Sequence, residues 1–185
     1  MRTAPSATLA RHWIPDRSLL SDAGLVIAFS LFTGLMAHIA IPLPFTPVPI
    51  TGQTFAVLLC GATLGARLGT ASMLAYITEG MLGLPVFAVA PGAASYGYLA
   101  GFVGAAFVVG WLADRGWTKD LPHTVVAMVA GEIAIYVFGL LWLGRFVPAS
   151  SVLALGLFPF LIGDAIKLAV AAAVLPAGWR LSRSR

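Results

Sequence analysis

Long apolar stretches that carry almost no charge are the feature that most limits what this chain can fold into. The first runs from Leu19 to Ile41, and its only acidic or basic residue besides His38 is Asp22, near its start. About 20 apolar residues suffice to cross a bilayer as one helix, and this stretch is longer than the apolar core of a signal peptide. The whole chain is 59% hydrophobic and 10% charged, against about 25% charged in soluble domains. The sequence therefore predicts an all-α integral membrane protein with one compact domain.

Breaks rich in proline, glycine and polar residues divide the apolar sequence into six segments that we expect to be transmembrane helices. Their expected ranges are 19–41, 52–64, the break at 65–67 to about 80, 97–113, 123–143 and 158–176. The second is short for a full span, and the fourth carries a close-packing stripe of Gly97, Gly101 and Ala105. We expect residues 1–18 to form a cytoplasmic tail, amphipathic or disordered, residues 19–176 the membrane domain, and residues 177–185 a basic cytoplasmic tail.

Basic residues are shared unequally between the two ends of the expected spans. With the N-terminus inside, the outer segments hold only Arg145. The cytoplasmic segments hold Arg2, Arg11, Arg17, Arg67, Arg115, Lys119, Arg180, Arg183 and Arg185. Cytoplasmic loops of membrane proteins are enriched in Lys and Arg, so we expect both termini in the cytoplasm and the protein in the cell (inner, or cytoplasmic) membrane. The net charge of +4 then reflects topology and contact with anionic membrane lipid, and nucleic acid is not an expected partner.

Three apolar loops rich in proline and glycine would lie on the outer face. The first, residues 42–51, has four prolines within eight residues, a density that no helix survives. The others cover residues 82–96 and 145–155. Irregular backbone at membrane depth is tolerated where it lines a cavity, so we expect these loops to cap a solute pocket open to the outside. Alternatively, the first loop rests on lipid headgroups.

An acid and a base lie within the last apolar segment. Asp164 and Lys167 are spaced i, i+3 and so share one helix face. Ionisable groups at membrane depth are costly unless they face an interior cavity and find partners, which makes the pair a functional-site hypothesis. Gln53 and Glu79 fall at the same outer mouth as further candidates, and Tyr96 could contribute from the second loop. Asp164 and Lys167 could also merely neutralise each other.

A competing function is an intramembrane enzyme that uses Glu79, Glu132, Asp164 and His38. Glu132 lies near mid-membrane, where it would support the pocket from behind or pack against a partner helix, and His38 lies near the outer end of the first span. However, no His-Glu-xx-His or Gly-x-Ser-x-Gly motif occurs, and no phosphate-binding loop of the type Gly-xxxx-Gly-Lys-[Ser/Thr]. The single cysteine, Cys60, fits a buried apolar role. We therefore expect a protein that is not an enzyme, has no metal or cofactor, and does not hydrolyse ATP itself.

Four segments carry a resemblance to a known family. They are Pro44-Phe-Thr-Pro-Val-Pro-Ile-Thr-Gly-Gln-Thr-Phe55, residues 61–68, Gly83-Leu-Pro-Val-Phe87 and Phe160-Leu-Ile-Gly-Asp-Ala-Ile-Lys167. In this order they resemble the BioY family, the biotin-specific substrate-capture (S) components of energy-coupling factor (ECF) transporters. The match spans roughly residues 20–175, and its first and last motifs are specific.

The resemblance implies six helices with both termini cytoplasmic and high-affinity capture of biotin from outside. It also implies a transmembrane coupling subunit and two ATPase subunits, dedicated or shared, as partners, and contact of Asp164 and Lys167 with biotin. The ureido ring of biotin offers two N–H donors and one carbonyl acceptor, so Asp164 can accept from an N–H while Lys167 donates to the carbonyl. Glu79 and Gln53 are second-rank ligands by the same reasoning. A transporter for another small amphipathic vitamin is the nearest alternative.

The first helix departs from the family pattern. Partner docking in the family is linked to an Ala-xxx-Ala surface on this helix, but the chain has Gly24-xxx-Ala28 and Ser30-xxx-Gly34 instead. Both pairs would still let a second helix approach closely. Docking of a partner is therefore expected, with the choice of seam left open.

Overall fold

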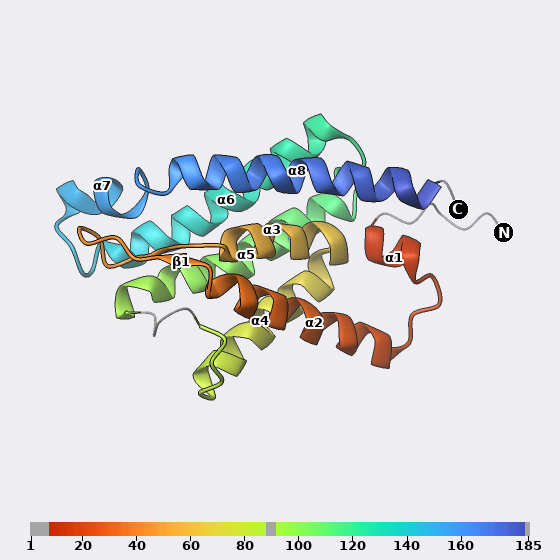
Figure 1. The fold of residues 1–185 in the computed structure, drawn as a ribbon, viewed down its shortest axis with the longest axis horizontal. Coiled ribbons are helices and arrows are strands. Elements are labelled where there is room, and N and C mark those ends of the chain that lie inside the picture. The colour runs from red at the N-terminus through yellow and green to blue at the C-terminus, as the bar shows by residue number, and fades with distance from the viewer. Residues whose placement is uncertain (1–7, 88–91, 184–185) are drawn as a thin grey trace.

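The computed structural model describes residues 8–87 and 92–183. Arg2, Arg185 and Pro91 lie outside the described residues. Six helices of 12 residues or more make up the body of the described part: α2 (Leu19–Ala37), α3 (Gln53–Leu64), α4 (Ala66–Met81), α5 (Tyr96–Ala113), α6 (Leu121–Leu143) and α8 (Leu161–Arg183). Shorter elements are α1 (Leu9–Trp13), α7 (Val152–Gly156), the 3-10 turns η1 (Ala93–Ser95) and η2 (Ala149–Ser151), and the strands β1 (Ala40–Ile41) and β2 (Ile50–Thr51). Figure 1 shows their arrangement.

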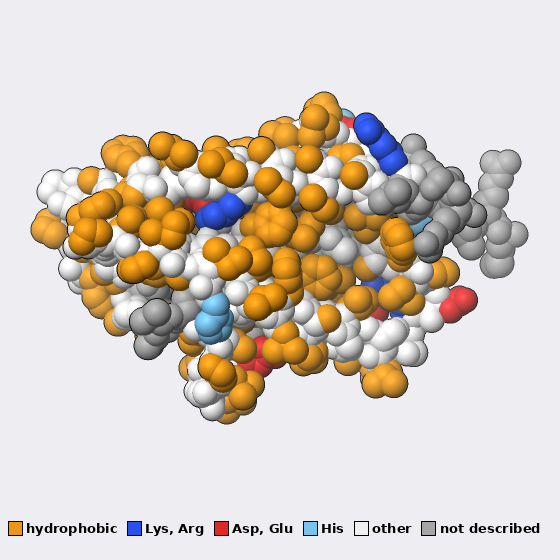
Figure 2. Space-filling model, viewed as in Figure 1, with side chains coloured by type: hydrophobic (Ala, Val, Ile, Leu, Met, Phe, Trp, Pro, Cys, Tyr) orange, Lys and Arg blue, Asp and Glu red, His pale blue; other side chains and the backbone are white. Residues whose placement is uncertain are grey.

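Four of the described helices are long and apolar enough to cross a membrane, over Leu19–Ala37, Ala93–Ala113, Leu121–Leu143 and Leu161–Arg180. Helix α3, with 12 residues, and α4, with 16, are shorter than a full span. On the face drawn in Figure 2, hydrophobic side chains are spread between the two ends with few charged ones among them. The chain is therefore a multi-pass membrane protein, in agreement with the class that its composition predicts.

Helix α5 forms the centre of the bundle because its small residues let neighbouring backbones come close. A Cβ atom added to Gly101 would lie 2.8 Å from the Ile135 Cα of α6, and one added to Gly61 of α3 would lie 2.7 Å from the Ala106 carbonyl oxygen. Ala105 is fully buried on the same helix. The stripe of small residues expected on this helix is thus confirmed as a packing surface.

The first proline-rich segment forms a hairpin, so the expected all-α fold also contains two very short strands. Ala40 pairs with Thr51 and Ile41 with Ile50 in antiparallel register. The prolines fall in the connecting loop, where they remove few hydrogen bonds. At its far end the Thr46 hydroxyl donates to the Leu155 carbonyl at 2.7 Å. The hairpin thereby contacts α7, a short helix that begins within the expected loop at residues 145–155.

The two ends of the described chain meet at one end of the molecule (Figure 1). Helix α8 continues beyond Pro176 to Arg183, so the expected helix end at Pro176 is wrong. Packing supplies the physical reason: Trp179 is buried, and its ring lies 5.4 Å from that of His12 on α1. Helix α1 buries Leu9, so part of the expected N-terminal tail is folded against the bundle. The membrane boundaries of both tails stay predictions.

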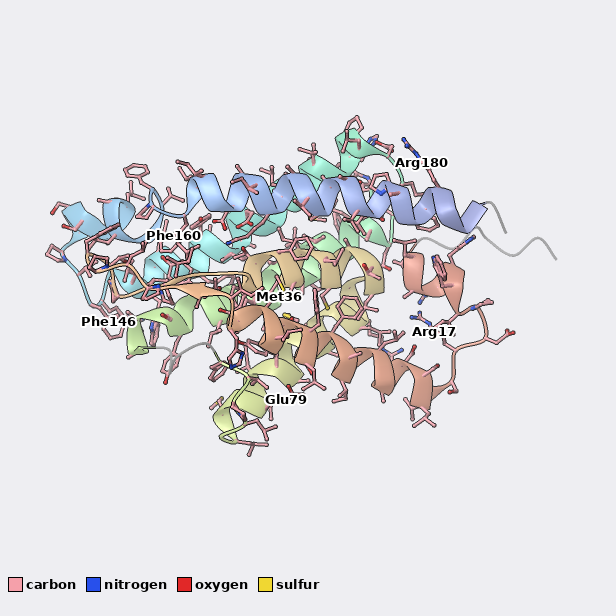
Figure 3. The ribbon with its side chains drawn as sticks, viewed as in Figure 1. Arg17, Met36, Glu79, Phe146, Phe160 and Arg180 are labelled. Atoms are coloured by element: carbon pink, nitrogen blue, oxygen red, sulfur yellow. The ribbon has the colours of Figure 1, made fainter. Side chains whose placement is uncertain are left out.

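Basic residues collect at this same end. The ammonium of Lys119, just before α6, lies 5.2 Å from the Trp179 ring. Arg145 follows the other end of α6, about 34 Å away along a 23-residue helix. Figure 3 places Arg17 and Arg180 at one end of the molecule and Phe146 at the other. The separation of basic residues along the bundle follows the pattern expected from the sequence.

Candidate binding site

A cavity lies between the hairpin and the long helices, toward the end of the molecule opposite α1. Its empty volume is about 670 Å³, including the space at its mouth. Every long helix except α2 contributes to its wall. The lining residues are Val48, Pro49, Thr51, Gln53, Thr54, Tyr76, Phe87, Ser95, Tyr98, Leu99, Phe102, Ile135, Tyr136, Phe160, Asp164 and Lys167. A mostly apolar lining with a few polar groups is typical of pockets for small molecules.

Asp164 and Lys167 stand together in the cavity wall, in the first two turns of α8. The Lys167 ammonium donates to Asp164 Oδ1 at 2.9 Å, and their side chains are only 18% and 9% exposed. The first turn of a helix also favours a carboxylate because the backbone N–H groups point toward it. The pair is thus largely withdrawn from solvent and faces the cavity.

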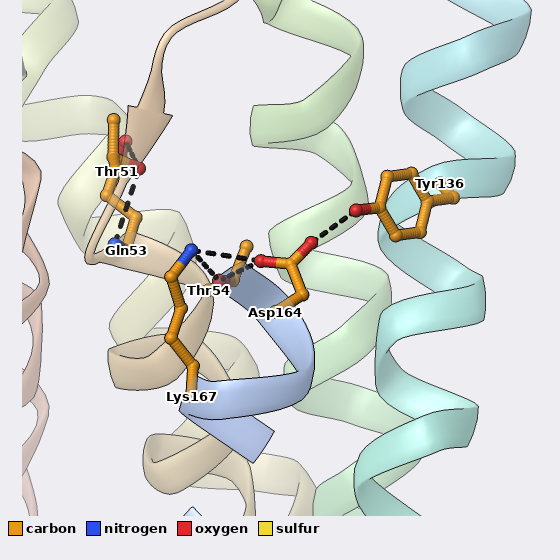
Figure 4. Close-up of polar contacts among 6 residues, drawn as sticks. All are labelled: Thr51, Gln53, Thr54, Tyr136, Asp164 and Lys167. Carbon is orange, nitrogen blue, oxygen red and sulfur yellow. Dashed lines mark hydrogen bonds and ion pairs between the residues drawn. The ribbon is translucent and has the colours of Figure 1, made fainter. Parts of the chain in front are cut away.

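Two hydroxyl groups complete the surroundings of Asp164 (Figure 4). The Thr54 hydroxyl of α3 donates to Asp164 Oδ1 at 3.2 Å and accepts from Lys167 at 3.1 Å. The Tyr136 hydroxyl of α6 donates to Asp164 Oδ2. Neither residue was among the site residues predicted from the sequence, although Thr54 directly follows the candidate Gln53. The carboxylate is therefore fixed by three helices and keeps acceptor capacity toward the cavity.

Gln53 anchors a second polar group of side chains, also drawn in part in Figure 4. Its amide oxygen accepts from the Thr51 hydroxyl at 2.8 Å, and its amide nitrogen donates to the Tyr76 hydroxyl at 2.6 Å. Tyr76 is fully buried, and its own hydroxyl proton is not used in these bonds. A ligand acceptor at this wall would therefore meet a fixed donor.

Aromatic and aliphatic side chains form most of the remaining wall. Phe87 meets the Tyr76 ring edge-on at 5.3 Å, and Phe102 and Phe160 are buried. The Tyr98 hydroxyl is occupied, because it donates to the Gly156 carbonyl at 2.8 Å. This surface suits an apolar ligand body, while the two polar groups can orient a polar head.

Two sequence-predicted site residues lie outside this cavity wall. Glu79 Oε1 accepts a hydrogen bond from the Ser30 hydroxyl of α2 at 2.8 Å. The Tyr96 side chain is half exposed and lines a separate surface hollow that includes Trp142 and Arg145. Tyr76, one turn before Glu79 on α4, faces the cavity instead. The rotation of α4, which the sequence alone does not show, thus decides which of its polar residues reaches the cavity.

Glu132 and His38 also lie away from the cavity wall. Glu132 is 8% exposed, and neither carboxylate oxygen has a hydrogen-bond partner among the described residues. It lies one turn before Tyr136 on α6, within electrostatic range of Asp164 and Lys167. His38 is exposed, and its Nδ1 lies 2.8 Å from the Gly34 carbonyl oxygen. Within the described ranges, no cluster of three His, Cys, Asp or Glu side chains could hold a metal ion.

The two small-residue pairs of α2 face different surroundings. Ser30 is fully buried, and a Cβ atom added to Gly34 would lie 3.0 Å from that of Val86. Gly24 and Ala28 are exposed, and nothing lies within 4 Å of a Cβ added to Gly24. Of these two seams, Gly24-xxx-Ala28 is the one open to another molecule.

Comparison with known proteins supplies a family for this architecture. The BioY family model matches residues 7–184. The "Probable biotin transporter BioY" of Pyrococcus horikoshii is 36% identical over 156 residues, which cover 81% of this chain and 91% of that protein. The "Biotin transporter BioY" of Thermotoga maritima is 37% identical over 157 residues, covering 80% and 92%.

A solved structure has the same fold. The crystal structure of an S-component for biotin from an ECF-type ABC transporter superimposes with a TM-score of 0.73 at 24% identity, covering 90% of this chain and 92% of that one. The match of the family model over nearly the whole sequence, with relatives more than one-third identical over about four-fifths of it, shows that the chain belongs to the BioY family.

Proposed function

We propose that this protein captures biotin from the outside of the cytoplasmic membrane and serves as the substrate-binding subunit of an ECF-type ABC transporter. The observation that carries the proposal is the Asp164–Lys167 pair, held by Thr54 and Tyr136 in the wall of an apolar cavity. The relatives named as biotin transporters support the choice of solute.

The chemistry of the cavity matches the polar head of biotin. Asp164 keeps acceptor capacity for a ureido N–H, and Lys167 has a donor left for the ureido carbonyl. Each charge-assisted hydrogen bond contributes about 1.5–3 kcal/mol. The apolar thiophane ring and valeryl chain would lie against Phe102, Phe160 and their neighbours. Glu79 and Tyr96 are not part of this ligand set because they lie outside the cavity wall.

The topology of the proposal is six crossings with both termini in the cytoplasm. The described ends of the chain lie together at the end that carries Lys119 and Arg180, and Arg145 lies at the other. An excess of basic residues marks the cytoplasmic side, which would put the cavity toward the outside. Helices α3 and α4 would then cross as short, partly enclosed segments.

The proposed partner surface lies on α2. Gly24 and Ala28 are exposed between long apolar side chains such as Leu20 and Leu31, and small residues allow close helix contact inside a membrane. A transmembrane coupling subunit would dock there, and two ATPase subunits would supply the energy. Ser30 and Gly34 are already occupied by packing within the chain.

Binding of labelled biotin to the purified protein in detergent tests the proposal. Wild type should bind tightly, and an excess of thiamine or riboflavin should not compete. Asp164→Asn should weaken binding by about tenfold or more, the loss expected for one charge-assisted bond. Glu79→Gln is the matched control, because it neutralises a carboxylate outside the cavity and should bind as wild type does. Failure of wild type to bind biotin would refute the proposal.

A further inference from the structure

Ser95 is a polar side chain in the cavity wall whose role is not explained by the fold. It is 8% exposed and lines the cavity, yet its hydroxyl has no hydrogen-bond partner among the described residues. Thr51, Thr54, Tyr98 and Tyr136, which line the same cavity, all bond to other groups of the chain. Leaving a buried hydroxyl unpaired is unfavourable, so Ser95 is available to a partner that enters the cavity.

The position of Ser95 also places its hydroxyl in the electrostatic field of a helix N-terminus. It ends the turn η1 and directly precedes α5, whose N-terminus carries a partial positive charge. The Ser95 side chain does not cap the helix. The turn is fixed from outside the cavity, because the Trp142 indole N–H donates to the Ala93 carbonyl at 2.8 Å. A rigid donor at a helix N-terminus suits a carboxylate.

Ser95 lies away from the acid–base pair, with apolar wall between them. Trp142 bonds to η1 and Tyr136 bonds to Asp164, and both residues lie on α6. They are six residues apart, or about 9 Å along the helix axis. Leu99 and Phe102 of α5, four and seven residues after Ser95, also line the cavity. The cavity wall thus offers the charged pair, the polar group at Gln53 and Tyr76, and a separate neutral donor at Ser95, with apolar side chains among them.

The charges of Asp164 and Lys167 decide which way round an anionic solute would lie in the cavity. Asp164 repels a second carboxylate, and Lys167 is already paired with Asp164 at 2.9 Å. Resting on the proposed function, we propose that the Ser95 hydroxyl and the N-terminus of α5 form the subsite for the carboxylate of biotin. The ureido ring then lies at Asp164 and Lys167, and the valeryl chain runs along Leu99 and Phe102. Ser95 is a specificity residue that selects the free acid over its neutral derivatives.

The test compares biotin with biotin amide, which keeps the ring and chain but lacks the charge. Affinities of both are measured by titration calorimetry for wild type, Ser95→Ala and Ser95→Thr. Ser95→Ala should weaken biotin by about tenfold, equivalent to about 1.4 kcal/mol, and the amide by less than about threefold, because a neutral bond contributes less. Ser95→Thr keeps the hydroxyl and should retain the preference for the acid. Ser150→Ala, an exposed serine in the turn η2, is the matched control and should behave as wild type.

The outcomes separate this subsite from the function on which it rests. Equal weakening of biotin and amide by Ser95→Ala would overturn the assignment, and so would unchanged binding of both. Loss of the preference in Ser95→Ala with its retention in Ser95→Thr supports the subsite. Wild type that binds neither ligand would refute biotin capture itself.

Discussion

The buried acid–base pair predicts that stability and binding can be separated. Changing Lys167 to Met leaves Asp164 in a 9% exposed position without its counter-charge. Removal of one partner from a buried pair costs about 3–5 kcal/mol. We expect the lower end, about 3 kcal/mol, because the hydroxyls of Thr54 and Tyr136 still donate to the carboxylate. For a chain of this size, that loss lowers the unfolding midpoint by roughly 6–12 °C.

A second substitution should restore stability without restoring function. In the double variant Asp164→Asn, Lys167→Met no unpaired charge remains, and the new side-chain amide oxygen at position 164 can still accept from a hydroxyl. The unfolding midpoint should therefore return to within about 3 °C of wild type, since neutral replacement of a buried pair is often tolerated. Biotin affinity should fall about 100-fold, because two charge-assisted contacts of at least about 1.5 kcal/mol each are lost.

Thermal unfolding in detergent and labelled-biotin binding, measured on the same preparations, check both parts. The control is Asp120→Asn, which neutralises an exposed i, i+3 pair with His123 and should change neither biotin affinity nor, appreciably, the midpoint. A double variant as unstable as Lys167→Met alone would refute the stability argument. A double variant with wild-type affinity would remove the pair from the binding site.

Three further predictions concern the proline-rich hairpin, a backbone turn and the carboxylate of Glu132. Thr46→Val deletes the hydroxyl that bonds the Leu155 carbonyl; biotin dissociation should be about two- to tenfold faster in a filter-binding chase, the effect of one neutral hydrogen bond. An unchanged rate would show that this bond does not hold the hairpin over the bound solute. Gly65 has φ +85°, and an added Cβ would lie 2.4 Å from Asp114 Oδ1. Gly65→Ala should therefore destabilise the protein by at least about 1–3 kcal/mol and lower its unfolding midpoint. A midpoint equal to that of wild type would contradict the argument from backbone strain. Glu132→Gln should keep biotin affinity within about threefold and should not lower the unfolding midpoint, because neither carboxylate oxygen has a hydrogen-bond partner among the described residues. Loss of binding comparable to that of Asp164→Asn would instead place Glu132 in the binding site.

The sequence predicted the helices well because apolar length and proline breaks are local signals. The expected segments 52–64, 97–113 and 123–143 differ from the structure by two residues or fewer at each end. It failed at Pro176, where α8 continues because Trp179 and α1 pack against its last turns. A contact between residues so far apart in the chain gives no signal in the sequence around Pro176. Helix α7 was not predicted because its five residues are too few to show a helical period.

The candidate site was only partly visible in the sequence. Asp164 and Lys167 stood out because charge is rare in an apolar run, and Gln53 because it follows the proline-rich loop. Tyr76, Tyr136 and Ser95 are ordinary residues of apolar helices and their ends, so only the rotation of each helix brings them to the cavity. The same rotation turns Glu79 toward Ser30 and Tyr96 toward the surface.

The shortness of α3 bears on how far a solute has to travel. Twelve residues rise only about 18 Å, whereas the hydrocarbon layer is about 30 Å thick. Gln53 and Thr54 of its first turn line the cavity, so in the proposed topology a solute bound there lies about the length of this helix above its inner end. In the proposed topology the bound solute thus starts part of the way across the hydrocarbon layer, and transport has to move it over the remaining distance.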